Sequence, residues 1–516
     1  MICSYQNWRV RQAPRAFAKI CLRGQLVMDR FAAFNGEGKN AELIAVVKKE
    51  CDTCRLVEPV LAELQNSGAK ITIYTQDDPT FPASLRGVID DTELEKSFHL
   101  DIETVPTLIK MESGAETGRV FGWHREQWKN LLGVDELFEE LPVMRPGCGS
   151  LSVQPGMPEI LRTRFGDTGI EARKIEVDFF ADPIEACYDR GWTDGLPVVP
   201  PTPERILRML EGTSRPRDQI IGRIPPNLSE CTIEKVAIAA VMAGCKPEYM
   251  PAVIGAIETA LEPNFTWHGI ICSTCSTSPL IIVNGPIAKR IGMNSGLNVL
   301  GQGNRANATI GRALNLLSRN FGGAKPGEID RSALGAPSKY TFCFAEDESN
   351  EEWEPLSVSR GIERGKSAVT LFQGEGIQLI IDQKSRTAEQ LAKSMAMSLC
   401  AVGHPKMCQW CNAVLVISPE HYAVYKRDGW NRQMIHDALV RHCRRPGNDL
   451  LEFTHGVGEG VLPKFKDQMV DKFNPEGLLL VRAGGPAGLY SAILAGWPTG
   501  RDKDDTYPIT REIADF

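Results

Sequence analysis

The chain has 516 residues and a formal net charge of −7, from 58 basic and 65 acidic side chains. This balance argues against a general nucleic-acid binder, which would carry a basic stripe. No apolar run reaches the roughly 18 residues that a membrane span requires, so neither nucleic acid nor a membrane is an expected partner. Domains usually hold about 100–200 residues, so the length predicts roughly two to four of them.

Residues 1–28 form a basic segment with five Lys or Arg residues, and the first acid of the chain is Asp29. An acid-free basic start resembles a transit peptide, but serines are scarce and a long apolar stretch is missing. We interpret residues 1–28 as a disordered or targeting-like tail and exclude them from the predicted fold. Whether the mature protein keeps them is left open.

Fifteen cysteines occur in the chain. They are scattered, apart from three CxxC pairs: Cys51/Cys54, Cys272/Cys275 and Cys408/Cys411. Oxidised extracellular frameworks are usually small and much denser in cysteine. A reducing, cytoplasmic location with reactive or metal-binding thiols is therefore expected.

Residues 42–135 alternate between strand and helix patterns. ELIAVVKKE predicts a strand, and RLVEPVLAELQNSG carries apolar residues at helical spacing up to a stop at Gly68. AKITIYTQDD predicts a second strand, and DTELEKSFHL predicts a short helix capped by Asp90 or Asp91. IETVPTLIKM, a strand interrupted at Pro106, and the helical REQWKNLLG complete the segment. The alternation predicts an α/β layered fold.

Two motifs in this segment resemble the thioredoxin family. CDTCRLVEPVLAEL matches the family's CxxC followed by a helix, with Pro59 five residues after Cys54. TVPT, residues 104–107, matches the cis-proline loop that packs opposite the CxxC. The resemblance covers residues 42–135 and implies a thioredoxin-like domain. It implies that Cys51 is the exposed nucleophile, Cys54 the buried resolving thiol and Pro106 the cis-proline of the centre.

The physical chemistry of the CxxC position supports these roles. A thiol at a helix N-terminus faces unpaired N–H groups and the positive end of the helix dipole, which favour the thiolate. Cys54 lies one turn further along and can resolve a mixed disulfide, while Pro106 has no N–H to compete for the sulfurs. Glu50 stands where the family carries tryptophan, and Ala45 where many members carry a buried acid. An anion at Glu50 opposes thiolate formation, so we expect a centre of specialised reactivity.

Residues 136–175 are rich in Pro, Gly, Ser and charged residues, which is typical of a linker. Cys148 lies in this segment and is interpreted as an exposed thiol. WTDGLPVVPPT, which follows, resembles a stretch found in uncharacterised bacterial proteins, a resemblance that implies no activity. It leads into an amphipathic helix with Thr202 as N-cap.

Residues 176–516 predict a larger α/β domain, in which an internal duplication relates about 231–320 to 387–445. Each copy has an alanine-rich helix, a CxxC, a short aliphatic strand, a proline and an amphipathic helix. Aligning Pro286 with Pro419 superposes Cys275 on Cys408, because each cysteine lies eleven residues upstream of its proline. Chance similarity of two ordinary strand–helix segments is the alternative.

The CxxC pairs of this region leave three interpretations open. Cys272, Cys275, Cys408 and Cys411 have the ligand types of a Cys₄ zinc site, although the 133 residues between the two pairs do not resemble a compact zinc ribbon. Cys272 or Cys275, near His268, is otherwise a nucleophilic thiol or a partner disulfide for the first domain. The third interpretation is a set of buried core thiols. The prediction is that the chain carries no metal and no cofactor.

VLGQGNRANATIGRALNLL combines glycines with polar residues ahead of a helix. Asn307 is a natural N-cap, and Arg305 and Arg312 place two cations around the helix start. This arrangement predicts a pocket for a small anion. A purely structural turn is the alternative.

The leading functional prediction is a thiol-disulfide oxidoreductase that works through Cys51 and Cys54. Its substrate would be a thiol or disulfide of its own C-terminal domain or of a partner protein. One alternative is an enzyme that acts on a small anionic substrate in the C-terminal domain, with the thioredoxin-like unit as a recycler. Another is a non-enzymatic thioredoxin-like adaptor. The sequence does not indicate the oligomeric state.

Overall fold

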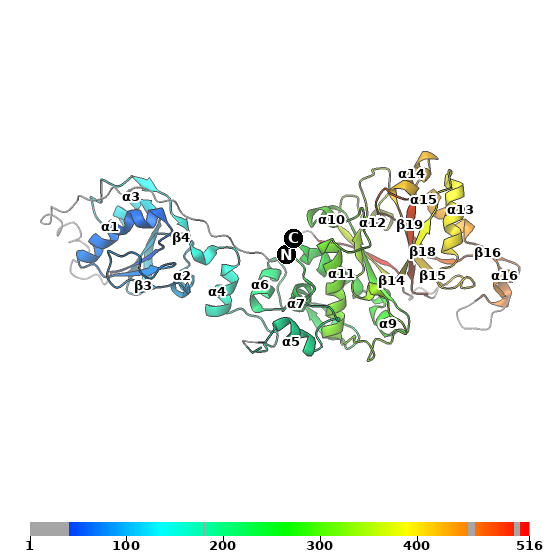
Figure 1. Cartoon of the computed structure of the whole chain (residues 1–516), viewed down its shortest axis with the longest axis horizontal. Helices are drawn as coiled ribbons and strands as arrows, with labels where there is room; N and C mark the ends of the chain where they lie inside the picture. The colour runs from blue at the N-terminus through cyan, green and yellow to red at the C-terminus, as the bar shows by residue number, and fades with distance from the viewer. Residues whose placement is uncertain (1–40, 179–180, 452–459, 500–505, 515–516) are drawn as a thin grey trace. The chain divides into compact units, whose positions relative to one another are not determined.

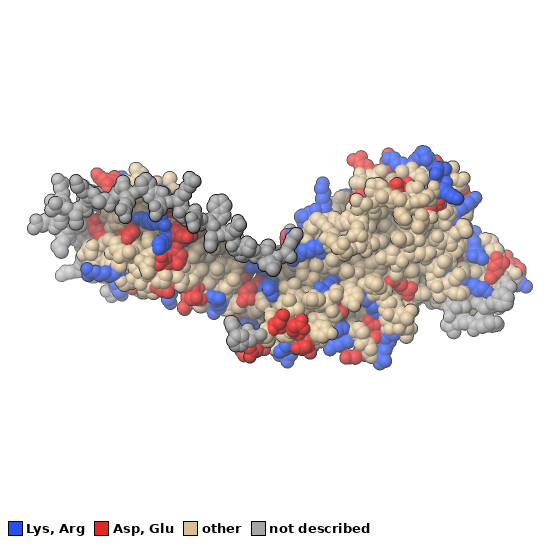
Figure 2. All heavy atoms as spheres, in the orientation of Figure 1, with Lys and Arg blue, Asp and Glu red and all other residues tan. Residues whose placement is uncertain are grey.

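The computed structural model describes residues 41–178, 181–451, 460–499 and 506–514. The predicted tail, residues 1–28, lies outside the described residues. The chain forms two compact units, Met1–Asp167 and Thr168–Phe516. Both mix helices with β-sheet, which confirms the predicted α/β class (Figure 1). On the faces shown in Figure 2, acidic and basic side chains are interspersed.

A five-stranded mixed sheet organises the first unit, in the order β3-β2-β1-β5-β6. Its central strand β1 runs parallel to β2 and antiparallel to β5, and β5 runs antiparallel to β6. Inward-facing residues of β1, including Leu43 and Val47, are fully buried. The strands are β1 (Ala41–Val47), β2 (Ile71–Thr75), β3 (Ile89–Asp90), β5 (Thr107–Glu112) and β6 (Ala115–Phe121).

Three helices of the first unit form where the sequence predicts them. They are α1 (Asp52–Asn66), α2 (Glu95–His99) and α3 (Arg125–Leu132). The apolar stripe of α1 packs on the sheet, and Gly68 follows the helix with φ +86°, where glycine is favoured. The N-cap residue of α2 is Leu94 and not Asp90 or Asp91, but the Asp91 carboxylate accepts hydrogen bonds from the backbone N–H groups of Lys96 (2.8 Å) and Ser97 (2.9 Å) in the first turn.

The predicted linker, 136–175, contains regular structure over part of its length. Within it the structure has β8 (Met144–Arg145), β9 (Cys148–Gly149), a 3₁₀ turn and α4 (Met157–Phe165). β8 pairs with β7 (Trp123–His124), and β9 pairs with β4 (Thr104–Val105). The prolines and glycines here allow tight turns that pack on the first unit, and the compact second unit begins at Thr168.

A curled seven-stranded sheet organises the second unit, in the order β13-β12-β14-β19-β15-β18, with β20 paired to β14. The 14-residue β14 pairs with β12 and β20 along its first half and with β19 along its second half. An irregularity between Gly374 and Ile377 separates the two halves and bends the sheet. The strands are β12 (Ser278–Asn284), β13 (Cys343–Ala345), β14 (Ala368–Ile381), β15 (Cys411–Ile417), β18 (Phe473–Arg482), β19 (Tyr490–Gly496) and β20 (Ile509–Glu512).

The two halves of this sheet repeat one pattern. β12 pairs parallel to β13 and antiparallel to β14, while β15 pairs parallel to β18 and antiparallel to β19. β14 and β19 then pair antiparallel at the centre. A helix that starts with proline follows the first strand of each half: α10 (Pro286–Arg290) and α14 (Pro419–Arg427).

Alternate residues of the strands enter separate cores. Ile281 and Val283 of β12 pack with α7, α8 and α11, whereas Leu280 and Ile282 face a core on the other side of the sheet. Residues of β15 alternate in the same way, and its helix-facing residues pack with α13, α14 and α15. The principal helices are α6 (Pro203–Leu210), α7 (Ile233–Ala243), α8 (Met250–Ala260), α9 (Trp267–Cys272), α11 (Arg305–Leu317), α13 (Ala388–Leu399) and α15 (Arg432–His442).

Thr202 is the N-cap residue of α6, and Pro203 occupies its first turn, as predicted. The remaining short elements are α5 (Pro183–Asp189), β10 (Ile220–Ile224), β11 (Ser229–Thr232), α12 (Leu356–Ser359), β16 (Arg445–Pro446), α16 (Gly447–Leu451) and β17 (Met469–Val470). Among the residues that the structure describes, no helix is both long and apolar enough to cross a membrane.

Candidate thiol-disulfide site

The first CxxC lies where β1 ends and α1 begins. Cys51 is the N-cap of α1, in an extended conformation, and its Sγ accepts a hydrogen bond from the backbone N–H of Cys54 at 3.4 Å. The backbone N–H of Lys48 lies 3.4 Å from Cys54 Sγ, within hydrogen-bonding distance for sulfur. Both cysteines are free thiols. Hence N–H groups at the strand–helix junction orient both sulfurs.

The TVPT loop packs against Cys51. The Val105–Pro106 peptide bond is cis, as predicted. Cys51 Sγ lies 3.5 Å from the carbonyl oxygen of Val105, immediately before that bond. Thus the structure brings together the three residues predicted for the centre: Cys51, Cys54 and the proline loop.

A segment that the sequence did not implicate covers this centre. We call residues Met144 to Ser150 the strap. Its backbone pairs antiparallel with the proline loop, with Cys148 opposite Val105 and Gly149 opposite Thr104. The backbone N–H of Ser150 extends this pairing by donating to the carbonyl of Glu103 at 2.9 Å.

Side chains on both flanks of the CxxC hold the strap in place. Lys48 Nζ donates to the carbonyl of Gly149, and Thr53 Oγ1 donates to the carbonyl of Pro146, each at 2.7 Å. The Arg145 guanidinium pairs with the Asp52 carboxylate at 3.1 Å. The strap is therefore attached to the residues on either side of Cys51.

The strap changes the role expected of Cys51. The expectation of an exposed nucleophile is wrong, because the side chains of Cys51 and Cys54 are both 0% exposed. Cys148, interpreted from the sequence as an ordinary exposed thiol, is half-buried and lies within hydrogen-bonding reach of Cys51. Three thiols therefore meet at this site, and Cys148 is the most accessible of them.

The thiols divide into one acidic sulfur and two proton donors. A hydrogen bond from the Cys54 thiol, together with one from Cys148, outweighs burial and lowers the pKa of Cys51 to about 5. Burial, followed by the bond to Cys51, raises the pKa of Cys54 far above its ordinary value. The bond to Cys51 and burial also raise the pKa of Cys148. The opposing effect expected from Glu50 does not prevent a low pKa at Cys51.

This pKa predicts the pH dependence of Cys51 alkylation. Only the thiolate attacks iodoacetamide, so the reaction should stay nearly constant from pH 8 to pH 6 and fall as the pH drops through about 5. An ordinary cysteine, with a pKa near 8.5, would lose most of its rate by pH 6. Mass spectrometry of the tryptic peptide 50–55 would measure the rate at each pH, with fragmentation to separate Cys51 from Cys54.

The CxxC pairs of the second unit occupy different environments. Cys272 and Cys275 are half-buried at the end of α9, and His268 on the same helix is exposed. Cys408 and Cys411 are buried at the start of β15, and burial raises the pKa of both. The described residues contain no group of three or more His, Cys, Asp or Glu side chains arranged to hold a metal, so the Cys₄ zinc alternative has no ligand set.

A second thiol pair was not anticipated from the sequence. Cys400 follows α13 and Cys443 follows α15, and these two helices pack together. A hydrogen bond from Cys443 outweighs burial and, with the charges of Lys472 and Arg445, lowers the pKa of Cys400 to about 6. The Lys472 ammonium is buried and donates to three backbone carbonyls, at 2.7, 2.8 and 2.8 Å. The cysteines are 43 residues apart, so no local motif reveals the pair.

The side chains predicted to form an anion pocket, Arg305, Asn307 and Arg312, all bond to other groups of the protein. Arg312 forms a two-pronged ion pair with Asp194, at 2.8 and 2.7 Å, and also donates to two backbone carbonyls. Arg305 donates to the carbonyl of Gly244 at 2.8 Å. Asn304, rather than Asn307, is the N-cap of α11. Asn307 is buried and bonds to the loop that precedes the helix.

Comparison with known proteins gives no family for the chain. No protein-family model matches it, and no curated protein matches it either. The thiol chemistry of the first unit therefore has to be judged from its own geometry. That geometry is an acidic buried sulfur, two neighbouring thiols and a cis-proline loop.

Proposed function

We propose that this protein is a thiol-disulfide oxidoreductase whose first unit is a thioredoxin-like domain. The observation that carries the proposal is the position of Cys51, at the N-terminus of α1 and 3.5 Å from the Val105 carbonyl beside cis-Pro106. The sheet order β3-β2-β1-β5-β6, with the CxxC after the central strand, supports the thioredoxin resemblance. A thiolate held by a helix start is the form that attacks disulfides.

Exchange begins when the Cys51 thiolate attacks one sulfur of a disulfide. A bond forms between Cys51 Sγ and that sulfur, and the other substrate sulfur leaves as a thiolate that takes a proton from water. Once Cys51 is in the mixed disulfide, it no longer raises the pKa of Cys54 by hydrogen bonding and charge. Cys54 then loses its proton, attacks Cys51 Sγ and releases the second substrate thiolate. The substrate disulfide has then gained two electrons and become two thiols. Cys51 and Cys54 have lost those two electrons and formed a disulfide.

Cys148 adds a third step, which moves the disulfide toward the surface. Its thiolate attacks Cys51 Sγ in the Cys51–Cys54 disulfide, so a Cys51–Cys148 bond forms and Cys54 leaves as a thiolate. Cys54 takes up a proton in place of the one that Cys148 released, and the protein neither gains nor loses electrons. In the oxidised centre the Cys51 thiolate that raises the pKa of Cys148 is gone, while the charge of Lys48 still lowers it. An external thiol can then react at the half-buried sulfur.

A redox titration of the full chain tests the proposed function. We expect peptide 50–55 to lose two hydrogens, with a midpoint between about −270 and −120 mV, the range of known thioredoxin-fold centres. The low pKa of Cys51 stabilises the reduced form and places the midpoint toward the oxidising end of that range. The measurement is alkylation and mass spectrometry after equilibration with dithiol buffers. Persistence of both thiols across the range would contradict the proposal and favour the adaptor.

The variant Cys54→Ser tests the role of Cys148 separately. With oxidised glutathione it should form a Cys51–Cys148 disulfide, which joins peptide 50–55 to peptide 130–162 after tryptic digestion. The matched control Cys54→Ser/Cys148→Ser should instead keep glutathione on Cys51. If the single variant also keeps glutathione on Cys51 while Cys148 stays free, the third step is wrong. The two-cysteine exchange would still stand if the wild-type titration succeeds.

We also infer that the second unit consists of two related halves. The matching strand orders β13-β12-β14 and β18-β15-β19 support this inference. So does the placement of Pro286 and Pro419 at the first turn of equivalent helices. In this alignment Cys275 corresponds to Cys408, yet the first is half-buried and the second is buried. The halves have therefore diverged in the accessibility of their thiols.

A further inference from the structure

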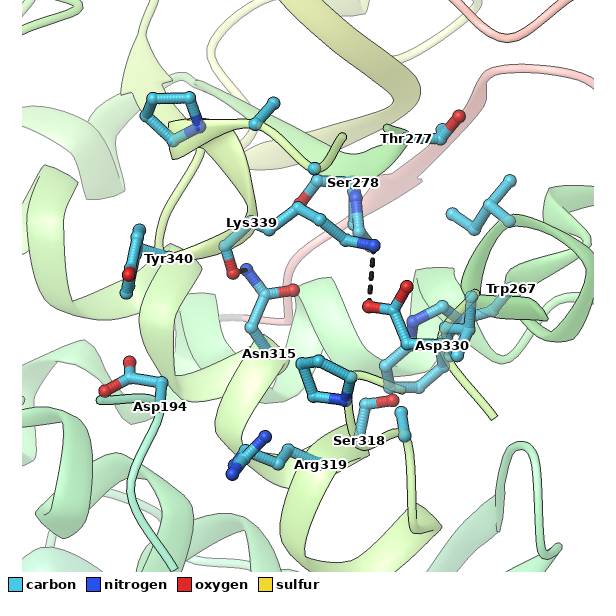
Figure 3. Close-up of a pocket in the computed structure, with 18 of the residues that line it drawn as sticks. Asp194, Trp267, Thr277, Ser278, Asn315, Ser318, Arg319, Asp330, Lys339 and Tyr340 are labelled. Atoms are coloured by element: carbon cyan, nitrogen blue, oxygen red, sulfur yellow. Dashed lines mark hydrogen bonds and ion pairs between the residues drawn. The ribbon is translucent and has the colours of Figure 1, made fainter. Parts of the chain in front are cut away.

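The second unit contains a cavity of about 420 Å³ beside the start of β12 (Figure 3). Its wall comes from α9, from the first residues of β12, from the end of α11 and from the loop 324–340. Asp194 of the WTDG stretch also borders it. Cavities of about 300–1,000 Å³ are typical of small-molecule sites. The volume is therefore sufficient for a small organic ligand.

Four polar atoms of residues that line this cavity lack a hydrogen-bond partner by geometry in the described structure: Thr277 Oγ1, Ser278 Oγ, Ser318 Oγ and Arg319 Nε. Of these, the Thr277 hydroxyl still interacts with the Glu375 carboxyl group, which leaves the other three. The side chains of Ser278 and Ser318 are only 2% and 4% exposed. A buried polar group without a partner costs about 1–3 kcal/mol, so such groups are usually satisfied. Their concentration around one cavity points to a ligand that supplies the missing partners.

The local backbone also distinguishes this cavity. After α11 the chain continues as a π-helical turn, Ser318–Gly322, which carries both Ser318 and Arg319. π-Helical turns are rare and frequently occur at functional sites. The wider turn places two consecutive polar side chains at the cavity wall, where Figure 3 shows them opposite Thr277 and Ser278.

The charges of the lining leave one positive charge uncompensated. Asp194 is paired with Arg312 at 2.7 Å, and Asp330 is paired with Lys339 at 2.6 Å. Burial raises the pKa of Asp330, but hydrogen bonds from Lys339 and Ser332 outweigh it and keep the group ionised. For the Arg319 guanidinium, the described residues supply neither an ion pair nor a hydrogen bond. A single negative charge on a ligand would balance the site, whereas a dianion would leave an excess.

The rest of the lining is apolar. Trp267, Ile270 and Ile271 of α9 contribute one side, and Pro279, Pro326 and Pro337 contribute further apolar surface. A ligand would therefore place a hydrocarbon body against these residues and its charge toward Arg319. Cys272 is the last residue of α9 and Cys275 lies on the turn that follows, between the lining residues Ile271 and Thr277, so the second CxxC adjoins the site.

From these observations we propose that this cavity binds a small organic monoanion, a carboxylate on an apolar body. Arg319 pairs with the carboxylate, and the hydroxyl of the adjacent Ser318 donates to its oxygens. Guanidinium groups match carboxylates in geometry, and such charge-assisted bonds are among the strongest in proteins. The site replaces the anion pocket that the sequence suggested at Arg305 and Arg312, and it is independent of the thiol centre of the first unit.

Calorimetric titration of the full chain with 2-naphthoate and 2-naphthamide tests the proposal. The two probes have nearly the same shape and differ in charge. We expect the wild-type protein to bind 2-naphthoate roughly tenfold or more tightly, because a hydrogen-bonded charge pair contributes that much. Arg319→Gln should remove the preference, and Arg319→Lys should retain part of it. Ala336→Phe, which fills the cavity, should weaken both probes.

The matched control is Arg223→Gln, which removes an exposed arginine of β10 in the same unit and should leave both affinities unchanged. If Arg319→Gln does not fold, Ser318→Ala takes its place and should reduce 2-naphthoate binding several-fold. Equal affinity of the wild-type protein for both probes would overturn the proposal. So would absence of binding by either probe, a preference that survives in Arg319→Gln, or unchanged 2-naphthoate binding in Ser318→Ala.

Discussion

Replacing Gly147 with Ala should raise the alkylation rate of Cys51 by roughly tenfold or more. An added Cβ at Gly147 would lie 2.5 Å from Thr104 Cγ2 and 2.7 Å from the carbonyl oxygen of Val105. The Val105 oxygen belongs to the proline loop and cannot rotate away, so the strap has to move. Overpacking of this size costs about 1–3 kcal/mol, and 1.4 kcal/mol corresponds to a tenfold change in the open population. Since Cys51 is fully buried under the strap, its reaction reports that opening.

The chain offers a matched control two residues away. A Cβ added at Gly149 has no heavy atom within 4 Å, so Gly149→Ala should leave the strap closed and the rate unchanged. Both variants add one methyl group to one segment and differ only in what that methyl group meets. Mass spectrometry of peptide 50–55 after timed exposure to iodoacetamide compares them. Equal rates in the two variants would mean that the strap does not control access to Cys51.

The thiol centre could be predicted in part because its main signals are local. CxxC, Pro59 and TVPT are short motifs, and the structure places Cys51 beside the cis-proline loop as those motifs imply. Cys148 could not be assigned, because its role depends on antiparallel pairing with residues more than forty positions earlier. Its surroundings, RPGCG, have the composition of a linker. Glycine in this segment permits close packing against the proline loop. Composition alone cannot distinguish glycines needed for close packing from glycines of a flexible linker.

The proposed anion-binding site of the second unit also depends on contacts that the local sequence does not reveal. Arg305 and Arg312 stood out because they flank a predicted helix start, where anions commonly bind. The partner of Arg312 is Asp194, 118 residues away in the chain, and nothing in the local sequence reveals this pairing. Arg319 lies two residues beyond the end of α11, in a π-helical turn that the apolar periodicity of the sequence does not predict. Sequence patterns identified the polar segment around Arg305 and Arg312, but they did not identify Arg319 as the arginine that is available to bind an anion.

The variant Arg312→Gln should destabilise the second unit by about 3 kcal/mol. The side chains of Arg312 and Asp194 are only 15% and 14% exposed, and removal of one partner leaves a largely buried carboxylate without its counter-ion. The carbonyls of Leu196 and Pro197 also lose a donor. Alkylation of the buried Cys245 and Cys343 as a function of urea concentration would follow unfolding of this unit specifically. Cys343 is well suited because it packs next to Gly311 of α11.

Two further variants test whether the unpaired Asp194 carboxylate causes the loss of stability in Arg312→Gln. Asp194→Asn combined with Arg312→Gln should be less destabilised than the sum of the single variants, since no charge is left unpaired. Arg319→Gln, at the end of the same helical segment, should change stability by less than about 0.5 kcal/mol, because it removes no ion pair of the described residues. If Arg312→Gln instead keeps full stability and loses 2-naphthoate binding, Arg312 would be a ligand-binding residue. We expect Arg312→Gln to reduce stability and Arg319→Gln to reduce 2-naphthoate binding. This difference would show that Arg312 supports the fold, whereas Arg319 binds the anion.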